Sequence, residues 1–200
     1  MTSQHSASGF TKLYNHLSSF VGDGSRPHTS KKVERFEADR SKDTLYDTLS
    51  RTDGLSHFKK IVDQSPEMVN VLKDSSKKLT LFACTNSGIK SLNNQGATMD
   101  AIKNMDADDI VAYHIADGVY TTQDMKYRIY YVNTLQGERL KINGLGIAYP
   151  KIGSRHMSTS VNTSENYEAS LFVGDIMCSN GVFHVISNFL VPESATSTAI

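Results

Sequence analysis

The segment Asp175–Ile186, which reads DIMCSNGVFHVI, decides the fold of this chain. At its centre, Asn180-Gly181 is one of the two strongest tight-turn dipeptides in the sequence, because Asn and Gly tolerate the positive φ angles that such turns require. We therefore expect a strand on each side of this turn. The second strand contains His184, which must share one face with Val182 and Ile186. The pattern indicates a buried, hydrogen-bonded histidine, with a catalytic base as the alternative.

Three further segments precede this one. Thr80–Asn86 reads TLFACTN, Tyr113-His114 is a Tyr-His pair, and Thr134–Gly144 reads TLQGERLKING. In this order, and with Leu190 and Pro192 after the last of them, the four segments resemble the signature segments of the fasciclin domain family. The resemblance covers residues 44–192. It implies an α+β fold, in which a compact wedge of two small β-sheets carries several short helices.

Three features depart from the family pattern. Cys84 stands where the family usually has proline, and Ser187 stands where it often has aspartate. Residues 150–168 look like an insertion ahead of the last signature, and we expect a long exposed loop there. Long loops on compact domains are often functional, so a functional loop and a tolerated excursion are both open.

Helical patterns occupy the first half of the domain and strand patterns the second half. The apolar spacing after Thr44 predicts two short helices that are separated near Asp53-Gly54, and Ser65-Pro66-Glu67 predicts the start of a third. Further helices are expected over 86–92, 99–105 and 107–115, a strand over 77–83, and a hairpin over 127–133 and 139–142. This segregation favours an α+β architecture over a doubly wound parallel sheet.

The chain divides into an extension, one domain and a tail. Residues 1–42 are rich in Ser, Thr and His, residues 43–193 form the expected domain, and residues 194–200 form the tail. Within the extension, an apolar stripe at helical spacing comprises Phe10, Leu13, Tyr14, Leu17 and Val21. The stripe could pack on its own domain, form a homodimer contact or lie on a membrane surface, and the first interpretation is the simplest.

Composition excludes several classes of function. Lys and Arg total 21, as do Asp and Glu, so no basic excess supports binding to nucleic acid. The seven histidines are scattered, no carboxylate cluster resembles a calcium loop, and no Gly-x-Ser-x-Gly elbow occurs. No window is apolar enough for a transmembrane segment. We therefore expect no metal, no cofactor and no catalytic residue.

Cys84 and Cys178 are the two cysteines, one in each of the outer signature segments. Two small buried hydrophobic residues are the simplest interpretation, because free cysteine is commonly part of a core. Since both segments are expected to be neighbours in the sheet, a disulfide or redox pair is the alternative.

The sequence leaves two cellular locations open. The N-terminus lacks the apolar stretch of a secretory signal, which favours an intracellular protein if the sequence is complete. The family resemblance implies an extracellular or surface-attached protein instead. Asn162-Thr163-Ser164 is a glycosylation sequon that matters only in the second case.

Two functions remain. By resemblance, the first is a binding module without enzymatic activity that contacts proteins, matrix or cell-wall glycans, and the family's adhesion positions correspond here to Tyr113, His114, Asp175 and Ile176. The second is a small-molecule-binding or biosynthetic accessory protein, including an enzyme of natural-product assembly, with a pocket under the inserted loop. Its walls would come from Tyr127, Tyr131, Tyr149, His156 and Tyr167. Ordinary strand positions would also explain these aromatic residues.

Overall fold

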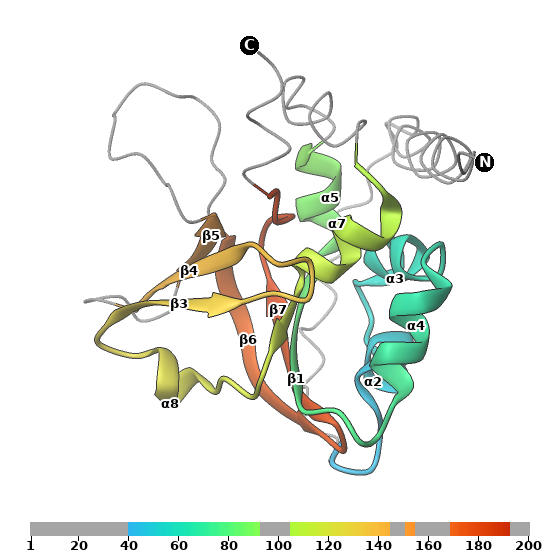
Figure 1. Cartoon of the computed structure of the whole chain (residues 1–200). Coiled ribbons are helices and arrows are strands. Elements are labelled where there is room, and N and C mark those ends of the chain that lie inside the picture. The colour runs from blue at the N-terminus through green and yellow to red at the C-terminus, as the bar shows by residue number, and fades with distance from the viewer. Residues whose placement is uncertain (1–39, 93–104, 145–150, 155–168, 193–200) are drawn as a thin grey trace, which may run out of the picture.

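The computed structural model describes residues 40–92, 105–144, 151–154 and 169–192, and Figure 1 shows their arrangement. The described residues form six helices and seven strands. The helices are α2 (Leu45–Arg51), α3 (Ser56–Val62), α4 (Pro66–Lys73), α5 (Asn86–Leu92), α7 (Ala107–Tyr113) and α8 (Thr122–Met125). The strands are β1 (Leu79–Cys84), β2 (Ile115–Asp117), β3 (Ile129–Asn133), β4 (Arg139–Asn143), β5 (Lys151–Ser154), β6 (Ala169–Cys178) and β7 (Gly181–Ile186).

The strands follow the order β2-β1-β7-β6-β5-β4-β3 and make two small sheets that share β6. Ala169 and Ser170 of β6 pair with β5, whereas from Leu171 onward β6 pairs with β7. The opposite margins also meet, because Ala116 forms a bridge with Thr134. The two sheets are therefore joined on both sides as a wedge, which confirms the expected α+β fold.

Local sequence signals account for the helix boundaries. Thr44 and Asp47 form a reciprocal capping box that begins α2, and Gly54, with φ of +79°, lies in the turn before α3. Ser65 accepts a hydrogen bond from the Met68 N–H at the start of α4. The expected pair of short helices and the proline-initiated third helix are thus confirmed.

The structure differs from the expected boundaries in two places. The helix expected over 107–115 ends at Tyr113, because Ile115 pairs with Leu81 as the first residue of β2. The loop expected over 150–168 begins as a strand, since β5 pairs with β4 on one side and with β6 on the other. Residues 155–168, nearly all of the helix expected over 99–105, and the N-terminal apolar stripe lie outside the described residues.

The centre of the wedge is the parallel pair of β1 and β7. Every residue of both strands is buried. Figure 1 shows the reason, since helices lie on one side of this pair and β3 and β4 lie on the other. A parallel pair that is covered on both faces requires apolar residues without alternation, which LTLFAC and GVFHVI nearly supply.

The Asn180 side chain connects this pair to the helices. It is fully buried, and its Oδ1 accepts a hydrogen bond from the Leu45 N–H at 2.8 Å. Its Nδ2 donates to the carbonyl oxygens of Leu72 at 2.9 Å and Asp74 at 3.1 Å. The backbone carbonyl of Asn180 accepts a hydrogen bond from the Leu79 N–H at 3.1 Å. One residue therefore fixes the start of α2, the end of α4 and the start of β1.

Gly181 allows β1 to approach this turn. A Cβ atom on Gly181 would lie 1.9 Å from the carbonyl oxygen of Leu79, much closer than any non-bonded contact permits. Both residues of the dipeptide are therefore required: Asn180 supplies the amide that binds the helices, and Gly181 leaves the space that Leu79 occupies.

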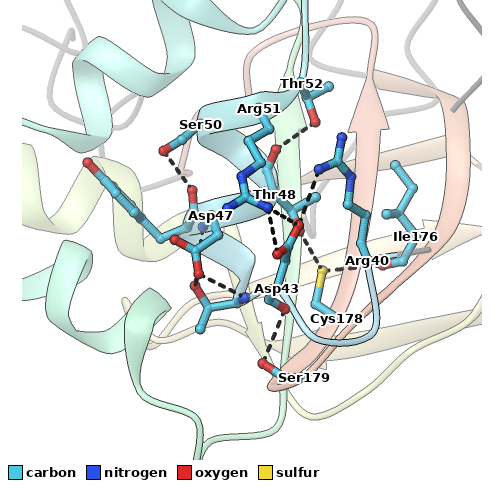
Figure 2. Close-up of polar contacts among 12 residues, drawn as sticks. Arg40, Asp43, Asp47, Thr48, Ser50, Arg51, Thr52, Ile176, Cys178 and Ser179 are labelled. Carbon is cyan, nitrogen blue, oxygen red and sulfur yellow. Dashed lines mark hydrogen bonds and ion pairs between the residues drawn. The ribbon is translucent and has the colours of Figure 1, made fainter. Parts of the chain in front are cut away.

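The first described residues are tied to the same turn, as Figure 2 shows. The Asp43 carbonyl accepts hydrogen bonds from the N–H and hydroxyl of Ser179, at 2.9 and 3.1 Å. The Asp43 carboxylate pairs with Arg51 at 2.8 Å and with Arg40 at 3.2 Å. Residues 40–43 therefore belong to the folded unit.

The two cysteines do not form a disulfide. Cys84 of β1 pairs with Ile186 at one end of β7, whereas Cys178 of β6 pairs with Gly181 at the other end of β7. The five steps from Gly181 to Ile186 correspond to about 16 Å along the strand. Both thiols are free and buried, and burial raises the pKa of each. The interpretation as small core residues is confirmed.

Replacing Asn180 tests its connecting role. Asn180→Ala leaves the buried Leu45 N–H and the Leu72 and Asp74 carbonyls without their partner, so we expect the free energy of unfolding to fall by about 3 kcal/mol or more. Asn133→Ala is the control, because Asn133 is exposed on β3 and should change stability by less than about 0.5 kcal/mol. Chemical denaturation measures both. Equal stabilities of the two variants would contradict the role given to Asn180.

Candidate functional site

The most irregular part of the sheet is β6. Its register against β7 shifts twice, first between Leu171 and Val173 and again between Val173 and Ile176. Such β-bulges re-aim side chains and often lie beside functional sites. Here they accompany two exposed apolar side chains, Phe172 (60% exposed) and Met177 (48% exposed).

Asp175 lies in the second bulge with φ of +60°. Its Oδ1 accepts a hydrogen bond from the Thr122 N–H at 2.7 Å, and its Oδ2 accepts from the Thr122 hydroxyl. Gly174 permits this contact, because a Cβ there would lie 2.4 Å from Cγ2 of Thr122. The carboxylate is exposed, yet both of its oxygens hold the start of α8. It therefore fixes the shape of this surface.

His184 supports the same bulge from inside the wedge. Its Nδ1 accepts a hydrogen bond from the Asp175 N–H at 3.2 Å, so the neutral ring donates from Nε2 to the Tyr120 carbonyl at 2.8 Å. The ring stacks on Phe82 with centroids 5.5 Å apart. Burial lowers the pKa of His184. Both nitrogens are engaged, which favours the structural interpretation over a catalytic base.

The Tyr113-His114 pair lies elsewhere, and both side chains are fully buried. Nε2 of His114 accepts from the Leu190 N–H at 3.0 Å, so the neutral ring donates from Nδ1 to the Ile110 carbonyl at 3.0 Å. The ring also packs on Phe189, with centroids 4.3 Å apart. In this conformation the pair has no surface to offer a partner, and it holds the segment after β7 in the core.

The aromatic residues expected to line a pocket are only partly described. Tyr127 is 80% exposed and has φ of +60°, and Tyr131 is half-exposed with the Arg139 guanidinium 5.5 Å from its ring centroid. Both rings are open to solvent. Tyr149, His156 and Tyr167 lie outside the described residues. The structure therefore does not bring the five residues together.

A cavity of about 400 Å³ lies in a different place. Its walls come from the turn between α2 and α3, from the start of α5, and from β6 and β7. The lining residues are Asp53, Gly54, Leu55, Thr85, Asn86, Ser87, Phe172, Val173 and Val185. Sequence reasoning missed this site, because its walls come from three distant segments and the bulge that turns Phe172 outward leaves no local pattern.

The described ranges contain neither a candidate metal site nor a candidate membrane span. Within them, no group of His, Cys, Asp and Glu side chains is arranged to hold a metal ion. None of the helices in these ranges is both long and apolar enough to cross a membrane.

Comparison with known proteins identifies the class. The family model of the fasciclin domain matches residues 53–192, and the chain belongs to the fasciclin domain family. Among solved structures, it is similar to a FAS1 domain pair from the insect cell adhesion molecule Fasciclin I, with 20% sequence identity and a TM-score of 0.58. The match covers 76% of this chain and 52% of that one, so the chain spans about half of the domain pair. The comparison with curated proteins found no match.

The buried histidines predict an acid-sensitive fold. Burial lowers the pKa of His114 from 6.5 to about 4. Between these pH values His114 binds a proton in the unfolded chain but not in the folded chain. We therefore expect stability that is present above pH 6.5 and is lost as the pH falls to 4. The loss from His114 is about 3 kcal/mol, and His184 adds to it in the same direction.

Denaturation at several pH values and NMR titration of the histidine rings measure these effects. The His114 ring should remain neutral at pH 5.5, whereas a histidine in the unfolded chain should be mostly protonated. A His114 resonance that titrates near pH 6.5 would contradict the expectation.

Proposed function

We propose that this chain is a binding module without enzymatic activity, and that it contacts a protein partner through the β6 surface. This surface consists of Asp175, Ile176 and Met177. The fasciclin family is associated with adhesion, and the solved relative is a cell adhesion molecule. Tyr113 and His114 support this function indirectly, through the integrity of the core.

The observation that carries the proposal is the free edge beside these residues. From Leu171 to Cys178, β6 has β7 on one side and no strand on the other among the residues that the structure describes. Unpaired strand edges with exposed apolar side chains are favourable places for another chain to bind. Met177 presents such a side chain, and the hydrogen bonds of Asp175 hold the backbone beside it in one shape.

Cell attachment to coated plates tests the proposal. We expect cells to attach to the wild-type chain, and Met177→Glu to reduce attachment at least tenfold, because a charge at the centre of an apolar contact must be desolvated. Leu135→Glu is the control, since Leu135 is an exposed apolar residue at the β3–β4 turn. Both variants should unfold at the wild-type denaturant concentration.

Treatment of the cells separates the kinds of partner. Loss of attachment after mild proteolysis supports a protein partner, whereas attachment that survives proteolysis but not glycosidase treatment would show a glycan. If the two variants attach equally well, the β6 surface is not the contact site.

A further inference from the structure

We propose that the cavity between the α2–α3 turn and β6 binds a small ligand with an apolar or aromatic body and a positively charged amine. This site shares no residue with the β6 surface defined above, so the two proposals fail or succeed separately. Three features of the site point to this ligand: the shape of the cavity, its single charge and the position of one phenylalanine.

The floor of the cavity is apolar. Leu55 and Val185 are core residues, and Val173 is a half-buried residue that packs against the same core. The volume of about 400 Å³ falls within the range of small-molecule sites, which are mostly apolar with a few polar groups. A body about the size of a substituted benzene ring would exclude water from this floor.

Phe172 forms the lip. The first register shift of β6 places it between the paired residues Leu171 and Val173, so it has no partner of its own on β7. A phenylalanine that is 60% exposed leaves much of its ring in water, and that area would be covered by a ligand in the cavity. The face of an aromatic ring also attracts cations, which adds to the selectivity for an amine.

Asp53 sets the charge of the site, because it is the one ionisable side chain among the lining residues. Neither a hydrogen bond nor an ion pair holds its carboxylate within the described part of the chain. Two of the other polar side chains hold helix starts, with Asn86 at the start of α3 and Thr85 at the start of α5. Asn86 Oδ1 accepts from the His57 N–H at 2.9 Å, and Thr85 Oγ1 accepts from the Gly88 N–H at 3.1 Å. The site therefore offers a negative charge and no positive one.

Three probes of nearly equal size test this charge preference. They are 3-phenylpropylamine, which is cationic, 3-phenylpropanol, which is neutral, and 3-phenylpropionate, which is anionic. Binding to the full chain is followed by the amide NMR shifts of Gly54, Phe172 and Val185. We expect saturable shifts with the amine and an affinity roughly fivefold or more above that for the propionate, as for one partly exposed charge pair.

Two variants and a control assign the effect to residues. Asp53→Asn should make the affinities of the amine and the propionate equal, and Phe172→Ser should weaken all three probes. Asp117→Asn is the matched control, because Asp117 is an exposed carboxylate at the end of β2, outside the cavity lining, and the wild-type preference should persist in it. The proposal is overturned if no probe shifts these amides at millimolar concentration, if amine and propionate bind equally to the wild type, or if Asp53→Asn keeps the preference.

Discussion

The buried amide of Asn180 is the interaction on which the rest of the structure depends. An amide that is removed from water stabilises a fold only when its donors and acceptor are all paired, and here they bind Leu45, Leu72 and Asp74. Leu45 begins α2, and Leu72 and Asp74 lie at the end of α4, so the positions of both helix ends are set by a turn between two strands. Gly181 then lets β1 enter beside that turn. The helical and sheet parts of the wedge are thus positioned by one dipeptide.

His114 and His184 also connect distant parts of the chain through buried hydrogen bonds. Each uses one nitrogen as donor and the other as acceptor, and each joins backbone groups that are far apart in sequence. His114 fixes the segment after β7, and His184 fixes the bulge that carries Asp175. The outer side of β6 carries the exposed side chains of Phe172 and Met177, and Phe172 is also the lip of the cavity.

The sequence predicts the features that depend on residues close together in the chain. It does not predict the features that depend on contacts between distant segments. The capping box at Thr44, Pro66 at the start of α4 and the Asn180-Gly181 turn all carry their own signals, so those boundaries were expected. The two bulges of β6 have no such signal, since alternation in that segment gives no hint of where the register shifts. The burial of Tyr113-His114 depends on Phe189 and Leu190, and the cavity depends on three segments. Neither could be read from periodicity.

The parallel pairing of β1 with β7 has a consequence for synthesis of the chain. Leu79 pairs with Gly181, and 181 − 79 = 102 residues separate them in sequence. At ordinary translation rates, about 5–20 s pass between the synthesis of β1 and that of its partner β7. Pairing between strands so far apart in sequence is also slow to form. During that interval LTLFAC is an apolar strand that other nascent chains could capture. Ile115 to Asp117 emerge much sooner and pair with Leu79 to Leu81 on the opposite edge. Because the three-residue strand β2 is translated before β7, it is the first partner strand to become available for Leu79 to Leu81.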